Sequence, residues 1–284
     1  MTQHTPTGDL DPFFVFEFRP IDEPDEHDPD RRPSTYWDLE RGCRGPHPLP
    51  DWVVTDRGAV DTDLGTIKTG KEADVLLVRR EATDGSGHTA LMAAKRYRDD
   101  RHRSFHRSAA YTESRRARRS RDTRALDRKS SYGRQVAASM WAQAEWQALC
   151  RYWEAGVAVP YPVQVDGTEI LMEFVGDDGL AAPRLAQTRP DPDLLGHYFE
   201  QVRDAMVRLA AQGVTHGDLS PYNVLADGER IVLIDLPQVV DIVANPQGMD
   251  FLLRDCENIC RWFGARGLHV DARELFGELV SFAV

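Results

Sequence analysis

Cysteine and long apolar stretches are both scarce in this sequence of 284 residues. The four cysteines follow no zinc-binding spacing, and we interpret them as reduced thiols. No apolar run approaches the roughly 18–20 residues that a membrane-spanning helix needs. The first residues, MTQHTPTGDLDPFF, lack the basic and then apolar regions of a signal peptide. These absences predict a cytoplasmic protein with no membrane partner.

The composition that remains allows a sizeable core, because 41% of the residues are apolar and 29% are charged. A chain of this length can form one large domain or two lobes around a cleft. The net charge of −11 is unevenly distributed. Residues 96–134 hold 14 Lys and Arg against 5 Asp and Glu, so this stretch carries about +9 and the remainder about −20.

The basic stretch at 96–134 has three interpretations that the sequence leaves open. Its arginines could grip the phosphates of RNA or of a ribosomal particle. It could instead fold back on the acidic remainder of the protein, or remain a solvated loop. Base stacking has weak support, since there is little aromatic interleaving beyond Tyr111 and Tyr132. Several of its serines are candidate autophosphorylation sites, and none stands out.

Composition and turn signals divide the chain into three parts. Residues 1–48 are rich in Pro, Asp and Glu, and we predict that they are largely disordered. Residues 49–175 are predicted to form a first lobe that contains a flexible basic insert at about 98–134. A break rich in Gly and Asp at 176–179 marks the junction with a second lobe, residues 176–284.

Apolar periodicity predicts an α+β protein, with a small antiparallel sheet in the first lobe and mainly helices in the second. The predicted elements are strands within 63–80 around a turn at 69–71, a hairpin turn at 84–87, a strand at 89–97, a helix at 136–155 ended by Gly156, strands at 163–165 and 169–175, a helix at 194–212, strands at 223–226 and 230–235, and a helical region at 249–282.

The segment HGDLSPYN at 216–223 is the most informative about function. Asp218 and Asn223 lie five residues apart on a predicted loop, and the apolar strand that follows ends in Asp235. A hairpin of this length brings Asp235 back beside Asn223. Carboxylate and amide oxygens suit a hard cation such as Mg²⁺. The H-G-D-x-x-x-x-N spacing, followed by a strand-ending aspartate, resembles the catalytic loop and metal-binding aspartate of kinases.

Two upstream residues supply what else phosphoryl transfer needs. Lys95 ends a predicted strand, at the position where a kinase-like fold places the lysine that grips the phosphates. Glu145 lies in the next predicted helix, on the face of Trp141 and Leu149. A carboxylate on a partly buried face needs a partner, and we expect Lys95 to provide it.

The turn Thr69-Gly70-Lys71 is in the place of a phosphate-covering loop. It lacks the glycines of a Walker A motif and of the usual glycine-rich kinase loop. We still expect the backbone amide of Gly70 and the ammonium of Lys71 to meet phosphate oxygens.

Together these segments look like one family. An STGKEA-type turn, a WAxxEW-like helix, an LMEFVGDDG linker followed by AAPRL, HGDLSPYNVL and LIDLPQVVD resemble a RIO-family atypical serine/threonine protein kinase over roughly residues 52–269. The resemblance is closer to the first RIO subfamily, with its bacterial-type members, than to the second. It implies a trimmed protein-kinase-like fold of two lobes, with a small antiparallel-sheet N-lobe and a mainly helical C-lobe.

The resemblance implies roles for individual residues. Asp218 would be the catalytic aspartate, and Asn223 and Asp235 would hold Mg²⁺ or Mn²⁺. Lys95 would contact the phosphates of ATP, steadied by Glu145. The remaining implied ATP contacts are the phosphate loop Thr69, Gly70 and Lys71, the gatekeeper Met172, and the backbone of Glu173 and Val175.

The resemblance also implies that the protein is an ATP- and Mg²⁺-dependent kinase or ATPase. Family members autophosphorylate, and some act chiefly as ATPases in ribosome maturation, with an aspartyl-phosphate that would form here on Asp235. Two other functions stay open. One is a small-molecule phosphotransferase of the aminoglycoside-kinase kind, which also uses an HGD…N…D arrangement. The other is a binding module switched by ATP.

Overall fold

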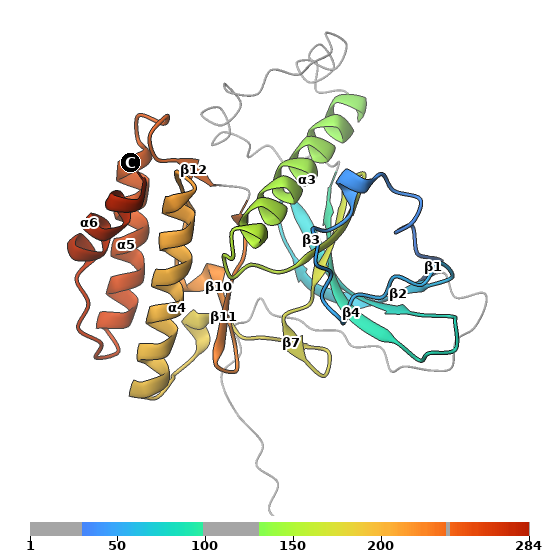
Figure 1. The fold of residues 1–284 in the computed structure, drawn as a ribbon, viewed down its shortest axis with the longest axis horizontal. Coiled ribbons are helices and arrows are strands. Elements are labelled where there is room, and N and C mark those ends of the chain that lie inside the picture. Colours follow the sequence, from blue (N-terminus) through green and yellow to red (C-terminus); the bar gives the residue numbers. More distant parts are fainter. Residues whose placement is uncertain (1–29, 99–130, 237–238, 284) are drawn as a thin grey trace, which may run out of the picture.

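The computed structural model of the protein describes residues 30–98, 131–236 and 239–283. Figure 1 shows a curled sheet with one long helix, α3 (Ser131–Glu154), beside it, and a second group of helices at the opposite end of the molecule. The architecture is therefore α+β, with a sheet lobe and a mainly helical lobe.

The sheet has six antiparallel strands in the order β1-β2-β3-β4-β6-β5. The strands are β1 (Arg31–Pro33), β2 (Val60–Thr69), β3 (Ala73–Glu81), β4 (Thr89–Tyr97), β5 (Pro162–Asp166) and β6 (Glu169–Glu173). Leu77 and Val78 on β3 are both buried although they point to opposite faces, so the sheet is covered on both sides. The turn between β3 and β4 falls at Gly85 and Gly87, which have the positive φ angles that glycine tolerates.

Residues 30–48 are folded, which differs from the prediction of a largely disordered segment at 1–48. β1 pairs with β2, and Tyr36 is buried against the sheet. The low apolar content of this segment suggested disorder, but its few aromatic and charged residues dock on a sheet that the rest of the chain builds. Residues 1–29 and most of the basic insert, 99–130, lie outside the described residues.

Helix α3 packs one side against the sheet and ends at a glycine, as predicted. Gly156 has φ 74° and donates its N–H to the Trp153 carbonyl (2.9 Å), while Val157 N donates to the Tyr152 carbonyl (2.9 Å). These two bonds form a Schellman motif, which satisfies the last carbonyls of the helix. The chain then enters β5.

The helical lobe contains three long helices and short strand pairs. The helices are α4 (Pro192–Ala211), α5 (Gly248–Gly264) and α6 (Ala272–Ala283), and the strand pairs are β7 (Gly176–Asp177) with β8 (Leu180–Ala181), β9 (Val214–Thr215) with β12 (Val240–Asp241), and β10 (Val224–Asp227) with β11 (Arg230–Leu233). Among the described residues, short 3-10 helices are η1 (Arg41–Cys43) beside the sheet lobe, and η3 (Leu185–Gln187) and η4 (Pro221–Asn223) in the helical lobe.

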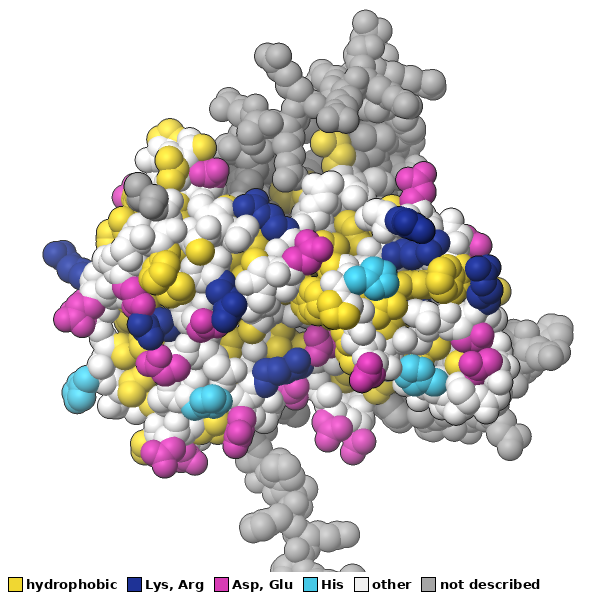
Figure 2. All heavy atoms as spheres, viewed as in Figure 1, with side chains coloured by type: hydrophobic (Ala, Val, Ile, Leu, Met, Phe, Trp, Pro, Cys, Tyr) yellow, Lys and Arg dark blue, Asp and Glu magenta, His cyan; other side chains and the backbone are white. Residues whose placement is uncertain are grey.

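One continuous apolar core joins the lobes. It includes Trp146 on α3, Val202 on α4 and Phe263 on α5. Within the described parts of the chain, none of the helices has the length and hydropathy needed to cross a membrane. Figure 2 shows Asp and Glu side chains over the whole of this face, several of them along its lower edge, with Lys and Arg side chains between them.

Candidate active site

A buried carboxylate on α5 fixes the predicted catalytic loop from below. Asp255 is fully buried, and its Oδ2 accepts hydrogen bonds from Thr215 Oγ1 (2.7 Å) and Gly217 N (2.8 Å). Its Oδ1 accepts one from Leu219 N (2.8 Å). These bonds hold the backbone on both sides of Asp218, whose side chain is exposed.

Sequence reasoning missed Asp255. Burial raises the pKa of its carboxyl, while hydrogen bonds and the neighbouring His216 act in the opposite direction. A signal was present, because Asp255 shares a helical face with Leu252, Cys256 and Ile259. A lone carboxylate on such a face must find partners.

The second half of the loop contains Asn223, the first predicted metal ligand, and lies beside Asp235, the second. Asn223 Nδ2 donates to the backbone carbonyl of Asp218 (2.9 Å), which leaves the amide oxygen of Asn223 as an acceptor. Ile234 N donates to Asn223 O (2.9 Å), and His216 Nε2 lies 3.0 Å from Ile234 O. The β10–β11 hairpin therefore brings Asp235, the residue after Ile234, beside Asn223.

Asp235 is held in an uncommon backbone conformation, with φ 67°. A residue other than glycine rarely adopts it, and such residues cluster at functional sites. The turn directs the Asp235 carboxylate toward the sheet lobe, where its Oδ1 lies 3.5 Å from Lys95 Nζ. The carboxylate is 45% exposed and so remains open to a ligand.

Lys95 stands between carboxylates of the two lobes. Its Nζ donates to Glu145 Oε1 (2.7 Å), and Glu145, only 3% exposed, also accepts a hydrogen bond from the Tyr97 hydroxyl. Burial disfavours the ammonium, but Glu145 and Asp235 outweigh this effect and raise the pKa of Lys95. The lysine is therefore charged at neutral pH.

The turn Thr69-Gly70-Lys71 joins β2 to β3. Gly70 donates its N–H to the Ala73 carbonyl (3.0 Å), and a Cβ at this position would lie 2.7 Å from the same oxygen. The Gly70 amide is thus engaged inside the turn, and its contact with phosphate oxygens stays a prediction. Thr69 and Lys71 are exposed, so their side chains stay candidates for phosphate contact.

Two more cations, which the sequence did not single out, face this region. Lys68 pairs with Val75 across the β2–β3 ladder, and Val75 pairs with Lys95 in the next ladder. Directly paired residues project from the same face of a sheet, so both lysines do. Partial loss of hydration, together with Arg184 and Lys95, lowers the pKa of Lys68, and Asp235 opposes this. The backbone of Arg184 lies beside β10 in the helical lobe.

The predicted adenine-binding segment lies at the end of β6. Met172 is 9% exposed and belongs to the core. Glu173 N donates to the Tyr161 carbonyl (2.8 Å), and the Val175 carbonyl accepts from Ala182 N (2.9 Å). These bonds use the Glu173 N–H and the Val175 carbonyl, and contact of the backbone of these two residues with adenine stays a prediction.

The donor set suits a hard divalent cation. Asn223 offers an amide oxygen and Asp235 a carboxylate, both ligands of Mg²⁺. In the ranges that the structure describes, no three His, Cys, Asp or Glu side chains gather into a group that could hold a metal. An ion at Asn223 and Asp235 would therefore take its other ligands from water and phosphates, as protein-bound Mg²⁺ usually does.

Kinase-type phosphotransferases pair a sheet lysine with a helix glutamate and set them opposite aspartates on a loop, and the fold and site define a protein of this class. The family follows from comparison. The RIO domain family model matches residues 83–275, and the chain belongs to the RIO family of serine/threonine-protein kinases.

Curated relatives agree with this assignment. The RIO-type serine/threonine-protein kinase Rio1 of Haloferax volcanii is 35% identical over 225 residues, which are 79% of this chain and 71% of the relative. The serine/threonine-protein kinase RIO3 of Mus musculus is 29% identical over 236 residues, 80% of this chain but 44% of the relative. The higher identity is to Rio1, in keeping with the predicted placement near the first RIO subfamily.

A solved structure agrees with the fold. The crystal structure of the Rio2 kinase-ADP/Mg²⁺-phosphoaspartate complex from Chaetomium thermophilum superposes with a TM-score of 0.52 and 21% sequence identity. The match covers 78% of this chain and 65% of that one. The predicted kinase-like fold of two lobes is thus confirmed.

Proposed function

We propose that this protein is an ATP- and Mg²⁺-dependent phosphotransferase that acts as a RIO-type serine/threonine kinase, as an ATPase, or as both. The observation that carries the proposal is the position of Lys95, 2.7 Å from Glu145 in its own lobe and 3.5 Å from Asp235 in the other. A cation in this place can hold a phosphate chain over the catalytic loop. The Rio2 neighbour contains ADP and Mg²⁺, which supports the same ligands here, with Mn²⁺ as an alternative ion.

In the proposed reaction, Lys95 neutralises charge on the phosphates and Glu145 keeps its ammonium in place. Asn223 and Asp235 would hold Mg²⁺, which when bound neutralises charge that develops on the transferring phosphoryl group. Asp218 accepts the proton of the attacking hydroxyl. As the new O–P bond forms, the bond between the γ-phosphorus and the bridging oxygen breaks, and ADP leaves.

The acceptor of the phosphoryl group has three candidates: a serine or threonine hydroxyl of a protein, water, and the carboxylate of Asp235. The Rio2 neighbour is a phosphoaspartate complex, and the exposed carboxylate of Asp235 is available for the same chemistry. An acyl phosphate on Asp235 is expected to be released by hydroxylamine and to be absent from Asp235→Asn. A phosphoserine or phosphothreonine would resist hydroxylamine.

Incubation of the purified protein with γ-labelled ATP and Mg²⁺ or Mn²⁺ tests the function. We expect labelled phosphate, labelled protein, or both from the wild type, and neither from Asp218→Asn. Glu257→Gln, an exposed carboxylate on α5, is the matched control and should retain full activity. If the wild type transfers no phosphoryl group with either metal, the enzyme proposal fails, and an ATP-switched binding module becomes the better hypothesis. Transfer to an aminoglycoside instead of protein or water would favour the small-molecule phosphotransferase.

The partner and the location of the protein remain proposals. We infer that the protein is cytoplasmic and that the basic stretch at 96–134 contacts RNA or a ribosomal particle, supported by its charge of about +9. RNA affinity that falls steeply with salt, and is lost when residues 101–131 are deleted, would support the contact. Unchanged affinity in the deletion variant would exclude it.

A further inference from the structure

Residues 30–50 run from β1 to helix α3 along the outside of the sheet lobe, and we call this segment the strap. The family model match begins only at residue 83, so the strap lies outside it. The strap is connected to the lobe at both of its ends, and its contacts near α3 lie next to the glutamate that holds Lys95.

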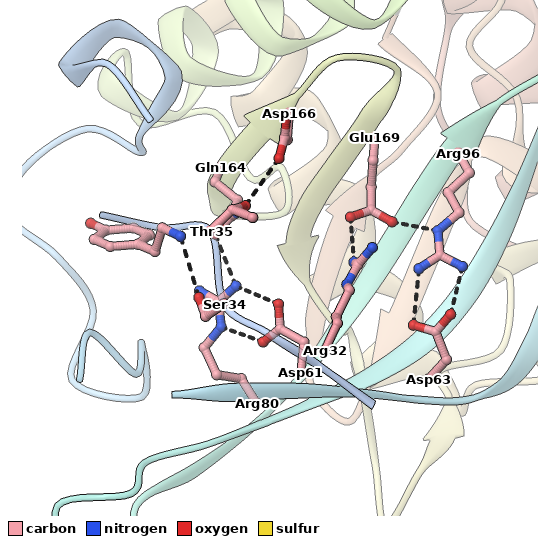
Figure 3. Close-up of polar contacts among 11 residues, drawn as sticks. Arg32, Ser34, Thr35, Asp61, Asp63, Arg80, Arg96, Gln164, Asp166 and Glu169 are labelled. Carbon is pink, nitrogen blue, oxygen red and sulfur yellow. Dashed lines mark hydrogen bonds and ion pairs between the residues drawn. The ribbon is translucent and has the colours of Figure 1, made fainter. Parts of the chain in front are cut away.

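The first half of the strap is anchored by ion pairs on the sheet, as Figure 3 shows. Arg32 Nη2 lies 2.5 Å from Glu169 Oε1, and Glu169 also pairs with Arg96. Arg96 makes two further contacts with Asp63, at 2.6 and 2.9 Å. The chain of charges connects β1, β6, β4 and β2, and Arg96 is the residue after Lys95.

A second polar chain anchors Thr35. Thr35 Oγ1 accepts from Gln164 Nε2 (3.0 Å) and donates to Asp166 Oδ2 (3.0 Å). Gln164 Oε1 accepts from Arg80 Nη2 (2.9 Å), and Arg80, which is fully buried, makes a two-point ion pair with Asp61 at 2.6 and 2.8 Å (Figure 3). Such two-point pairs fix geometry as well as charge, so the strap starts from a rigid base.

The second half of the strap reaches α3. Trp146 is 2% exposed, and its indole N–H donates to the Gly42 carbonyl (2.9 Å). Trp146 is the residue after Glu145, and consecutive residues of a helix project about 100° apart. Glu145 therefore binds Lys95 on the sheet while Trp146 binds the strap on an adjoining face of the same helical turn.

The strap is seated close against β5 just beyond this contact. Gly45 N donates to the Val163 carbonyl (2.9 Å), and the Tyr161 hydroxyl donates to the Pro46 carbonyl (2.9 Å). A Cβ on Gly45 would lie 2.1 Å from the Pro162 carbonyl oxygen and 2.4 Å from Tyr161 Oη. Any side chain at Gly45 must lift the strap, because backbone cannot yield at such distances.

We propose that the strap positions α3 and thereby sets the Lys95–Glu145 ion pair, with Gly45 and Trp146 as positioning residues for phosphoryl transfer. The inference rests on the proposed function. A helix clamped on one side by the sheet and on another by an anchored segment cannot rotate without breaking a contact. Displacement of the catalytic pair by about 1 Å can reduce a rate by about two orders of magnitude.

The chain offers a matched pair of glycines to test this. Gly45→Ala lifts the strap, whereas Gly42→Ala, three residues away, has open space around its Cβ and keeps the carbonyl that Trp146 needs. In the full-length protein we expect Gly45→Ala to lower kcat for phosphate release by about 10- to 100-fold, with a smaller change in KM for ATP. Gly42→Ala should stay within about twofold. Equal kcat values for the two variants would overturn the proposal.

A second variant and a measurement that does not depend on activity test the proposal further. Trp146→Phe keeps an aromatic ring but removes the N–H, and it should lower kcat while far-ultraviolet circular dichroism stays unchanged. Hydrogen exchange of the α3 backbone amides 139–150 should be faster in Gly45→Ala and in Trp146→Phe than in Gly42→Ala. Unchanged exchange would overturn the proposal even if the wild type transferred no phosphate, whereas inactivity of the wild type alone bears only on the proposed function.

Discussion

At the scale of single residues, Lys95 keeps its charge through one carboxylate from each lobe. Glu145 is buried and lies 2.7 Å from the ammonium, while Asp235 lies 3.5 Å away and is half exposed. The buried acid therefore holds the lysine in place. If the exposed acid exchanged its contact with Lys95 for a metal ion, the ammonium would be left to pair with a phosphate. One cation thus connects a structural pair to a site open to ligands.

We expect Lys95→Met to abolish phosphoryl transfer and to lower the free energy of unfolding by about 1–3 kcal/mol, because Glu145 then remains buried and, among the described residues, keeps Tyr97 as its partner. Urea denaturation and phosphate release measure the two effects. Adding Glu145→Gln to Lys95→Met should restore much of the stability and none of the activity. Recovery of activity in the double variant would contradict the role of Lys95.

Asp255 carries a prediction about stability and pH. In Asp255→Asn an NH₂ group replaces one acceptor oxygen and faces a backbone N–H, which should cost about 1–3 kcal/mol of unfolding free energy. Because burial raises the pKa of Asp255 in the folded state, the folded protein binds this proton more tightly than the unfolded one does. Its contribution to stability should therefore fall as pH rises from the ordinary carboxyl range through the raised pKa.

Urea denaturation across that pH range should show this slope in the wild type and a smaller one in Asp255→Asn. Glu257→Gln, exposed two residues away on the same helix, should change stability by less than about 0.5 kcal/mol. The assignment fails if the two variants behave alike.

Lys68 is expected to strengthen ATP binding, since it projects from the sheet face of Lys95 and is influenced by Asp235. Lys68→Ala should raise KM for ATP by up to about 5-fold, because one solvent-accessible cation contributes up to about 1 kcal/mol. The effect should shrink at high salt. Arg189→Ala, which removes an equal charge at an exposed loop position, should leave KM unchanged; a matching increase there would assign the effect to net charge.

At the scale of elements, helix ends and turns were the easiest features to predict. Gly156 ended a clear helical pattern, and the structure ends α3 there with φ 74°. Gly156→Ala should lower the unfolding free energy by about 1 kcal/mol because alanine resists that conformation. Gly196→Ala, inside α4 and with open space around its Cβ, should instead raise it by about 0.5–1 kcal/mol. Thermal unfolding of the two variants, run side by side, tests the opposite signs.

The catalytic loop and the Lys95–Glu145 contact were predictable for a related reason. Asp218, Asn223 and Asp235 are close in sequence, so a single hairpin fixes their geometry. The partner of Glu145 could be predicted because a carboxylate on an apolar helix face must be paired. The strap was not predictable, since its order comes from docking on distant strands, as in the pairing of Arg32 with Glu169. The composition of a segment indicates how much apolar surface it can bury by itself. It does not indicate which contacts the segment makes with a sheet formed by other parts of the chain.

At the scale of the molecule, the core that runs from α3 through α4 to α5 makes the lobes mechanically dependent. The proposed ligand site lies between them, with Lys95 on one side and Asp235 on the other. We therefore expect a single thermal unfolding transition in calorimetry instead of one for each lobe. We expect ADP with Mg²⁺ to move this single transition to higher temperature. The free energy of unfolding should increase by about 2.7 kcal/mol at a ligand concentration 100 times Kd.

The variant series gives this prediction its control. Asp235→Asn removes a ligand of the proposed Mg²⁺ site, so the stabilisation by ADP with Mg²⁺ should fall toward that by ADP alone. Gly42→Ala should keep the wild-type shift, because its open surroundings leave the strap seated. If instead the sheet lobe melted in a separate step that ligand did not move, the continuous core would not couple the lobes. The strap would then act on α3 within an independent unit, and the effect of Gly45→Ala on hydrogen exchange should stop at the sheet lobe.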